Sequence, residues 1–393
     1  MSQTPIALIY CDELLAYSAT FVRSQAEALH QFTPVYVGCR TVSGLELPGD
    51  RTHVINPGGL SGKLTESAFK LLGIAPGFTS RLRQLKPALL HAHFGPHAVR
   101  AMPLAKTLGV PLITTFHGYG VTMTDDAVMQ SKSYSHKTYV RRRGQLQRQG
   151  HLFIAISDFI RGKMLEQGYP SEKVVVHYVG IDTQLFQPEP TIRREPIVLF
   201  TGRLVEKKGC EYLIRAMSQV QQVMPDVELV IIGDGPLRDE LERQAQATLK
   251  RYRFLGIQPP EQVRHWMNRA RLFCVPSIIA ESGDAETFGI VFAEAQAMGL
   301  PPVSFASGGI PEAIAHEETG LLAPERDWRA LAEHILRVLN DSDLWQYFSH
   351  KGQMRVRAQF DLHRQTQHLE ELYHTVLSSS STPCSTDMQI ARL

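Results

Sequence analysis

The chain has 393 residues, which is long for a single hydrophobic core, since domains usually contain about 100–200 residues. Its composition, with 43% hydrophobic and 20% charged residues, is that of an ordinary globular protein, and its formal net charge of +2 gives no reason to expect a nucleic acid as partner. The five cysteines are scattered and form no Cys-x-x-Cys pair, which argues against a disulfide framework and a structural zinc site and indicates a reducing compartment.

No run of about 18 apolar residues occurs, so no segment is expected to span a bilayer. The first six residues, Met-Ser-Gln-Thr-Pro-Ile, contain no basic region followed by an apolar stretch, and we expect no signal peptide. These features predict a cytoplasmic protein. A peripheral position at the inner face of the cytoplasmic membrane is the alternative.

Short apolar runs alternate with helix-length segments along the whole chain. In the first half the predicted strands are 6–10, 35–38, 53–55, 88–93, 112–116, 152–156 and 174–177, and helical periodicity is clear over 99–108 and 159–167. In the second half the predicted strands are 197–200, 227–232, 253–255, 272–275 and 302–304, with helices over 211–223, 237–248, 290–298 and 328–339. Continuous apolar runs such as Leu229-Val-Ile-Ile are typical of strands buried on both faces, so the pattern predicts an α/β fold with parallel, doubly wound sheets.

The best candidate for a linker is the segment 187–196, which contains three prolines and several charges. It predicts two domains, 1–190 and 191–360. The pattern of leucines after Phe360 predicts a terminal helix over 361–377, and the serine-rich segment 378–393 lacks apolar periodicity, which is typical of a disordered tail.

The segment from Glu286 to Glu294 carries the strongest chemical signal. Gly289 permits a tight loop before an apolar helix, whose first N–H groups and positive dipole end suit a diphosphate. Two carboxylates beside a phosphate site can accept hydrogen bonds from ribose and sugar hydroxyls. On spacing alone, however, a helix-capping glutamate and a solvated one remain the simpler interpretation.

A second cluster favours the phosphate interpretation. Arg203 and Lys208 lie in a loop that follows a predicted strand, and together they could neutralise a diphosphate without a metal ion. Lys207 is interpreted as a surface residue. The glycine turn at 231–236 also ends a strand, but it is not a Gly-x-Gly-x-x-Gly motif and predicts no dinucleotide.

In the first half, His117 beside Gly118 ends a predicted strand and could touch a donor hydroxyl. His91 and His93 end a neighbouring strand; His91 is interpreted as structural, and His93 is open between the two roles. No His-x-x-x-His or His/Cys spacing indicates a metal site.

These segments, in this order, resemble the retaining GT-B glycosyltransferases of family four. The matching motifs are Gly-Arg-Leu-x-x-x-Lys-Gly at 202–209, Gly-Asp-Gly-Pro at 233–236, Glu-x7-Glu at 286–294, and the segments 295–301, 307–312 and 318–322. The resemblance covers residues 5–377 and is most specific in the second half. The segments 91–95, 116–118 and 277–286 resemble the branch that builds bacterial exopolysaccharides such as colanic acid.

The resemblance implies the GT-B fold, with two Rossmann-like domains that face a central cleft and a C-terminal helix that crosses back to the N-terminal domain. It implies that residues 1–190 bind the acceptor and residues 191–360 bind the nucleotide-sugar donor. Arg203 and Lys208 would hold the diphosphate, Glu294 the ribose hydroxyls and Glu286 the donor sugar. His117 matches the histidine near the transferred sugar and, with Glu286, is the catalytic assignment.

Further donor contacts implied by the resemblance come from Gly202, Ile257, Gln258, Phe288, Gly289 and Ile290, of which Ile257 and Gln258 fall where the base is cradled. Two positions depart from the family pattern. Thr287 stands where glycine is common, and Ala16-Tyr-Ser-Ala-Thr20 replaces the usual Gly-Gly after the first strand. This second departure leaves open whether Ser18 and Thr20 contact the acceptor or the phosphate.

The activity implied by the resemblance is that of a hexosyltransferase. It would need neither a metal ion nor another cofactor, and would move a hexose from a UDP-sugar, with GDP-sugars as the alternative within the family, to a glycan or lipid-linked acceptor. Attack from the front face, with the departing diphosphate as base, would retain the anomeric configuration. Asp341-Ser-Asp343 has the spelling of a metal-binding motif but lies between two predicted helices, where we expect it to cap a helix.

The basic segment 132–148, which also contains Tyr134, Tyr139 and Leu146, could lie against anionic lipid, or it could be a solvated helix face. Three other functions stay open. A UDP-sugar 2-epimerase shares the fold but would need more acids around the sugar, and a glycosidase would need two carboxylates flanking one bond. A non-catalytic nucleotide-sugar-binding protein would bind a donor without turnover.

Overall fold

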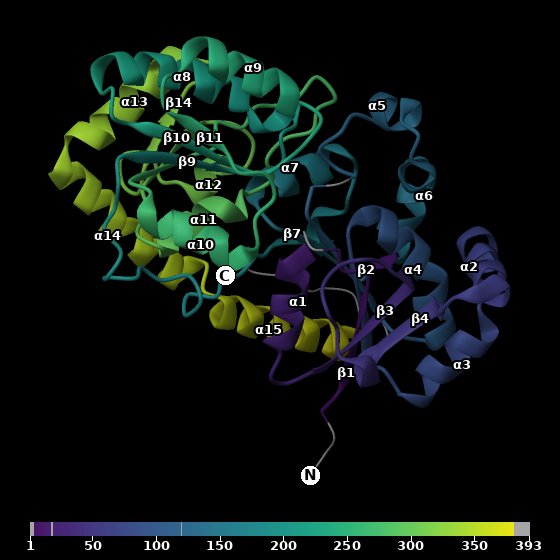
Figure 1. The fold of residues 1–393 in the computed structure, drawn as a ribbon. Coiled ribbons are helices and arrows are strands. Elements are labelled where there is room, and N and C mark those ends of the chain that lie inside the picture. Colours follow the sequence, from purple (N-terminus) through teal and green to yellow (C-terminus); the bar gives the residue numbers. More distant parts are fainter. Residues whose placement is uncertain (1–3, 17–18, 119, 381–393) are drawn as a thin grey trace. The chain divides into compact units, whose positions relative to one another are not determined.

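The computed structural model describes residues 4–16, 19–118 and 120–380. Contacts divide the chain into two compact units (Figure 1). The first is built from the described residues up to Gly180 together with those from Leu362 onward, and the second is Ile181–Asp361. Both are α/β units, as the alternating pattern predicts.

The first unit contains a parallel sheet in the order β4-β3-β1-β5-β6-β7-β8, with β2 also paired to β3. Its strands are β1 (Ile6–Tyr10), β2 (Glu13–Leu14), β3 (Thr33–Thr41), β4 (Thr52–Asn56), β5 (Leu89–His93), β6 (Leu112–Phe116), β7 (Leu152–Ala155) and β8 (Val174–Val176). The direction of winding reverses between β1 and β5, and ligands bind at such a reversal, beyond the carboxyl ends of the strands, in open α/β sheets.

The helices of this unit cover the sheet and include one from the end of the chain. They are α1 (Thr20–Glu27), α2 (Gly59–Leu72), α3 (Pro76–Gln84), α4 (Gly95–Leu108), α5 (Asp125–Gln130), α6 (Tyr134–Gln149), α7 (Asp158–Glu166) and α15 (Leu362–Ser380). The yellow helix α15 lies beside the purple α1 in Figure 1, and Leu369, Tyr373 and Val376 join the same hydrophobic core as Ile9 and Phe32. The C-terminal helix therefore belongs to the first unit.

The second unit contains a parallel sheet in the order β11-β10-β9-β12-β13-β14, which reverses between β9 and β12. Its strands are β9 (Ile197–Thr201), β10 (Glu228–Ile232), β11 (Tyr252–Phe254), β12 (Leu272–Cys274), β13 (Pro302–Phe305) and β14 (Leu321–Ala323). Its helices are α8 (Cys210–Val223), α9 (Arg238–Thr248), α10 (Pro260–Arg269), α11 (Ile290–Ala297), α12 (Ile310–Ala313), α13 (Trp328–Asn340) and α14 (Ser342–Gln359).

The proline-rich segment 187–196 lies inside the second unit, and the contacts divide the chain ten residues before the predicted boundary, between Gly180 and Ile181. Arg194 explains why the segment 187–196 belongs to the second unit. Its guanidinium donates hydrogen bonds to the carbonyls of Met267 (2.8 Å), Ala270 (2.7 Å) and Met298 (2.6 Å). The segment is thus held to the C-terminal ends of α10 and α11 in the second unit.

Two local expectations concern chain ends and caps. The carboxylate of Asp341 accepts a hydrogen bond from Leu344 N at 2.9 Å and caps α14, so the expected capping role is confirmed. Helix α15 continues to Ser380, three residues into the predicted tail, because its serines bond back to the preceding turn, as Ser378 does to the carbonyl of His374. The rest of that tail, 381–393, lies outside the described residues.

Among the helices of the described residues, none is long and apolar enough to cross a bilayer. The segment proposed for lipid contact forms α6, and it buries Tyr139 and Leu146 completely. Only Tyr134 of the three side chains named for that contact is exposed. The apolar side of α6 packs against α4 instead of facing outward.

Candidate functional site

The second unit places its candidate residues beyond the carboxyl ends of its strands. The loop after β9 carries Gly202 and Arg203, and its shape is fixed by a neighbouring glycine turn: Gly202 N donates to Ile232 O (3.0 Å) and Leu204 N to Asp234 O (2.9 Å). A Cβ on Gly233 would lie 1.9 Å from Gly202 O, so glycine is required there. The glycine turn at 231–236 therefore supports the loop that presents Arg203.

Arg203 is exposed at this edge. In the part of the chain that the structure describes, its guanidinium takes part in no ion pair and no side-chain hydrogen bond, so its donors are available to an anion. Its five N–H groups in a planar fork match the oxygens of a phosphate.

Lys208 and Glu286 form an ion pair that joins the loop after β9 to the loop after β12. Both side chains are largely buried, with exposed fractions of 14% and 13%. Burial acts to raise the pKa of Glu286, but Lys208 and Lys207 outweigh it and hold the pKa below its usual value. The carboxylate is thus ionised at neutral pH. Lys207 pairs with Asp284 at 3.1 Å, in agreement with a surface role.

Helix α11 begins at this edge, immediately after Gly289. Gly289 has φ +81°, which other residues adopt only with strain, and Gly309 N donates to Glu286 O (2.8 Å), so the loop is tied to the segment after β13. Ile290 opens the helix, whose first N–H groups have no intrahelical acceptor. Phe288 is buried and packs on Phe360, with ring centroids 5.0 Å apart, so only its backbone can face a ligand.

Glu294 lies about one turn inside α11. Burial raises the pKa of its carboxyl group to about 7, and Arg264 only partly offsets this effect. Ile257 and Gln258 follow β11 at the same edge of the sheet. The side chain of Ile257 is 81% exposed, so its apolar surface is available to a ligand. Gln258 Nε2 donates a hydrogen bond to Leu255 O at 2.6 Å.

Three buried hydroxyl groups at this edge were not found from the sequence. Thr201, Ser277 and Ser307 follow or end β9, β12 and β13, and their side-chain oxygens have no hydrogen-bond partner among the described residues. Buried polar groups are nearly always paired, so these are further candidates for ligand contact. Ser277 and Ser307 begin two of the segments that carry the family resemblance, but a sequence does not show that a hydroxyl group is buried without a partner.

The first unit places His117 beyond the carboxyl end of β6. His93 Nδ1 lies 3.0 Å from His117 Nε2, and the ring of Phe94, a residue with φ +71°, lies 4.9 Å from that of His117. Burial lowers the pKa of His117 well below its usual value, with His93 and His97 adding to the effect. The imidazole is therefore neutral at pH 7.

His91 is structural, as expected, because it is buried and bonded to Tyr373 Oη (2.6 Å) and Thr115 Oγ1 (2.7 Å). Asp12 and Arg100 form an ion pair just beyond β1, where the winding reverses, and it was not predicted from the sequence. Its two members are 88 residues apart in no shared motif. Ser18, the remaining candidate, lies outside the described residues.

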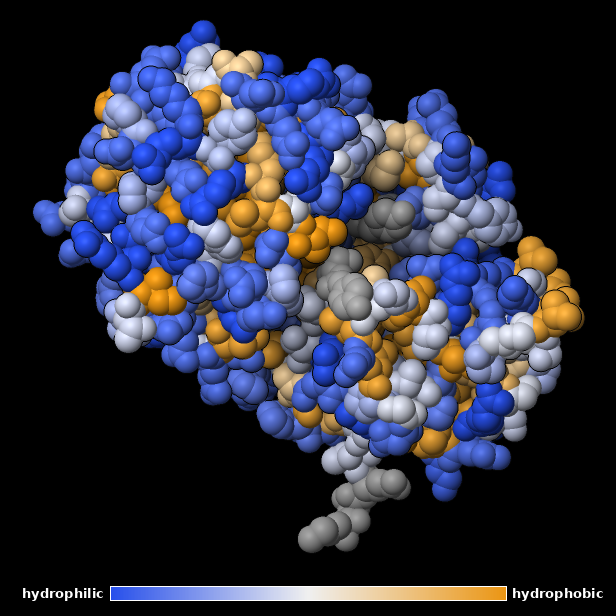
Figure 2. Space-filling view, viewed as in Figure 1, coloured by the Kyte–Doolittle hydropathy of each residue, from blue (hydrophilic) through white to orange (hydrophobic). Residues whose placement is uncertain are grey.

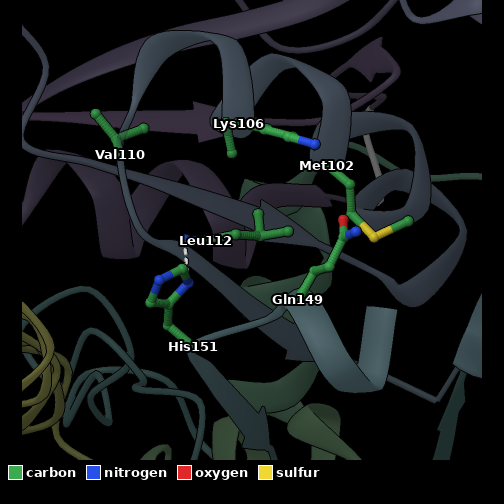
Figure 3. Close-up of a pocket in the computed structure, with 7 residues that line it drawn as sticks. Met102, Lys106, Val110, Leu112, Gln149 and His151 are labelled. Carbon is green, nitrogen blue, oxygen red and sulfur yellow. Dashed lines mark hydrogen bonds between the residues drawn. The ribbon is translucent and has the colours of Figure 1, made fainter. Parts of the chain in front are cut away.

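A cavity of about 260 Å³ occurs elsewhere in the first unit (Figure 3). It is lined by Met102, Ala105, Lys106, Val110, Leu112, Gln149 and His151. Leu112 begins β6 and His151 precedes β7, so this cavity opens at the amino ends of the strands. It is separate from the candidate site, which lies at the carboxyl ends. Among the described residues, no three His, Cys, Asp or Glu side chains are grouped so that they could hold a metal ion.

The chain is similar to known glycosyltransferases over nearly its whole length. Residues 18–185 match the family model described as Glycosyltransferase Family 4, and residues 182–355 match Glycosyl transferases group 1. WcaL of Escherichia coli, named for colanic acid biosynthesis, is 32% identical over 255 residues, which are 62% of this chain; the chain spans 59% of the length of WcaL. The amylovoran biosynthesis glycosyltransferase AmsK of Erwinia amylovora is 30% identical over 318 residues, covering 73% of this chain and 77% of AmsK.

Among solved structures, HepE of Anabaena in complex with UDP and glucose has a TM-score of 0.74 with 20% identity, over 95% of this chain and 100% of that chain. This likeness shows the two-unit fold, and the sequence relatives show the family. The chain belongs to the family-four glycosyltransferases with the GT-B fold, in the branch that contains the colanic acid and amylovoran glycosyltransferases.

Proposed function

We propose that this chain transfers a hexose from a UDP-sugar to a glycan or lipid-linked oligosaccharide in the synthesis of an exopolysaccharide, with retention of configuration and without a metal ion. The observation that carries the proposal is the pairing of Lys208 with Glu286 beside an unpaired Arg203, beyond the carboxyl ends of β9 and β12. The names of WcaL and AmsK, which refer to colanic acid and amylovoran biosynthesis, support an exopolysaccharide as the product. The UDP bound to HepE supports UDP as the nucleotide of the donor.

Donor binding would exchange one set of ion pairs for another. In the structure Lys208 is neutralised by Glu286. A sugar hydroxyl can donate to the Glu286 carboxylate while the diphosphate takes Lys208 and Arg203, and the N-terminus of α11 adds further N–H donors. These groups offset the two negative charges of the diphosphate, which is the work that a divalent cation does in metal-dependent transferases.

The reaction would proceed on one face of the sugar. The bond from the anomeric carbon to the diphosphate oxygen breaks, the acceptor oxygen forms its bond to the same carbon on the same face, and the acceptor proton passes to the departing diphosphate. His117 is neutral, so it would act as a hydrogen-bond partner of the sugar and not as a general acid.

A lipid-linked acceptor would place the chain at the inner face of the cytoplasmic membrane. Helix α6 can contribute basic charge to such a contact, but Arg143 is already engaged by Asp125, at 2.9 and 2.7 Å. Because Tyr139 and Leu146 are buried, α6 has little apolar surface to insert.

The donor site can be tested by thermal shift with UDP-, GDP- and ADP-sugars. We expect UDP-sugars to raise the melting temperature and the other two classes to leave it unchanged. Arg203→Ala and Lys208→Ala should each weaken UDP-sugar binding about tenfold or more, because each removes a charge-assisted contact to phosphate.

Lys207→Ala is the matched control, since the neighbouring lysine pairs with Asp284 at the surface and should leave binding unchanged. If Lys208→Ala binds the donor as well as the unchanged protein does, this donor site is wrong. Turnover with a lipid-linked acceptor in the presence of a chelator tests metal independence, and the anomeric coupling in the NMR spectrum of the product tests retention.

A further inference from the structure

Helix α2 (Gly59–Leu72) exposes leucines on the side opposite to its buried face. The buried face is formed by Gly62, Glu66 and Phe69. Leu60, Leu64 and Leu71 lie within about 40° of one another around the helix axis, on the outward side. Their exposed fractions are 81%, 72% and 69%; Leu72, the last residue of the helix, is 70% exposed, and Ile74, two residues beyond it, is 53% exposed.

This arrangement is the reverse of the usual pattern for a surface helix, in which the apolar stripe faces the core. Figure 2 shows the result as an orange patch at the right-hand edge, where α2 lies in Figure 1. We call the surface formed by Leu60, Leu64, Leu71, Leu72 and Ile74 the α2 leucine face. Phe69 already anchors the helix to its sheet, so folding does not require these five side chains, and contiguous exposed apolar surface usually marks an interaction site.

The exposed charges of α2 and of the segment that follows it have one sign. The segment 57–86 contains five basic residues, Lys63, Lys70, Arg81, Arg83 and Lys86, and one acidic residue, Glu66. Glu66 is buried and engaged by Lys70 and by Asn56 Nδ2, at 2.6 Å from the latter. The charged side chains that this segment exposes are therefore all basic.

We propose that the α2 leucine face lies in the interfacial layer of a membrane that contains anionic lipids. A helix of 14 residues is about 21 Å long, and leucines on one side of it can enter the headgroup and acyl boundary by about 5–10 Å while the flanking lysines meet the lipid phosphates. The contact is peripheral, since among the described residues no helix can cross the bilayer.

Charge complementarity favours lipid over a second copy of the chain. A two-fold pairing of the same surface would bring the basic side chains of one copy near those of the other, and the segment exposes no carboxylate to compensate. Anionic headgroups supply the missing negative charge, at about 1 kcal/mol for each basic residue near the surface. This inference concerns α2 alone and holds whether or not the proposed donor and reaction are correct.

Flotation of the full chain with lipid vesicles tests the proposal. We expect binding to vesicles of phosphatidylglycerol and phosphatidylcholine in equal amounts, and much weaker binding to phosphatidylcholine alone. The triple variant Leu60→Gln, Leu64→Gln, Leu71→Gln should reduce the bound fraction about tenfold or more, and Lys63→Glu should reduce it to a smaller extent. Glutamine keeps a helix propensity close to that of leucine, so α2 itself should persist.

The matched control makes the same substitution at three exposed apolar positions of the second unit, Leu185, Val223 and Met354, and should bind like the unchanged protein. Circular dichroism and the rise in melting temperature with UDP-glucose should be the same in all variants, which separates loss of lipid binding from loss of the donor site. Equal binding by the α2 triple variant and the unchanged protein would overturn the proposal. So would a dimer of the unchanged protein that the triple variant converts to a monomer, because the partner would then be a second copy.

Discussion

At the scale of single residues, we expect Glu294, which is proposed to bind the ribose, to make the binding of the donor depend on pH. Burial raises the pKa of its carboxyl group to about 7. In the proposed site the ribose hydroxyls would donate hydrogen bonds to the ionised carboxylate, so donor binding would favour the deprotonated form. The affinity should therefore rise about tenfold between pH 6 and pH 8, as the ionised fraction in the free protein rises from about a tenth to about nine tenths.

Calorimetric titration with UDP-glucose measures this slope, because the diphosphate of a nucleotide sugar has no group of its own that titrates near pH 7. Glu294→Gln cannot ionise and should bind more weakly, with an affinity that no longer changes over this range. A slope that persists in Glu294→Gln would assign the titration to another group and remove the proposed role of Glu294.

The charged residues of the site can be predicted from the sequence, but the ion pair between two of them cannot. Arg203, Lys208, Glu286 and Glu294 are found because each stands in a motif that resembles a known family. The ion pair between Lys208 and Glu286 joins residues 78 positions apart, and only the register of β9 beside β12 brings them together. The hydroxyl of Ser277 shows the limit, since an unpaired buried serine looks like any other serine in a sequence.

At the scale of elements, Gly289 sets the geometry of the N-terminus of α11. Its φ of +81° is strained for other residues, and a Cβ there would lie 2.5 Å from Phe292 Cδ2. Gly289→Ala should lower the free energy of unfolding by about 1–3 kcal/mol and also weaken UDP-glucose binding, because the first turn of α11 must shift. Chemical denaturation and titration with UDP-glucose measure the two effects.

Gly162 provides a control for the same substitution. It lies within α7 in the first unit, and a Cβ there would meet nothing within 4 Å. Gly162→Ala should therefore be neutral or stabilise the protein by up to about 1 kcal/mol, without any change in donor binding. If Gly289→Ala folds and binds the donor as well as Gly162→Ala does, the N-terminus of α11 is not part of the donor site.

Buried strands were the easiest elements to predict. Each strand predicted from an apolar run is present, namely β1 and β3 to β13, because strands covered on both faces leave apolar runs in the sequence. Strands β2 and β14, which have two and three residues, were not predicted. Helix α2 was not predicted either, since its outward leucines and its buried Gly62 and Glu66 invert the usual periodicity.

At the scale of the whole molecule, the last helix of the chain completes the first unit. Helix α15 brings Glu370 and Tyr373 to residues that precede them by about 280 to 340 positions. The leucine pattern predicts the helix, but no local pattern predicts the unit on which the helix packs. Only the family resemblance predicts that it packs on the N-terminal domain. The contacts decide it: Tyr373 lies in the core of the first unit, with its ring 5.1 Å from that of Phe32.

The carboxylate of Glu370 is the polar part of this attachment. It is 2% exposed and accepts hydrogen bonds from His30 N at 2.7 Å and Gln31 N at 2.5 Å, where α1 gives way to β3. Glu370→Ala leaves two backbone donors without this acceptor and should lower the free energy of unfolding by about 2–4 kcal/mol. Glu371→Ala, at the exposed neighbouring position, should change it by less than about 0.5 kcal/mol.

Hydrogen exchange locates the effect, because each unit has its own sheet and its own core. In Glu370→Ala, amides of residues 28–37 and of α15 should exchange faster, while those of β9 and β10 in the second unit keep their rates. UDP-glucose should still protect the loop after β9 in this variant, since the residues proposed to bind the donor belong to the second unit. Equal acceleration in β9 and β1 would mean that the two units open together, and the attachment of α15 would then stabilise the whole chain and not the first unit alone.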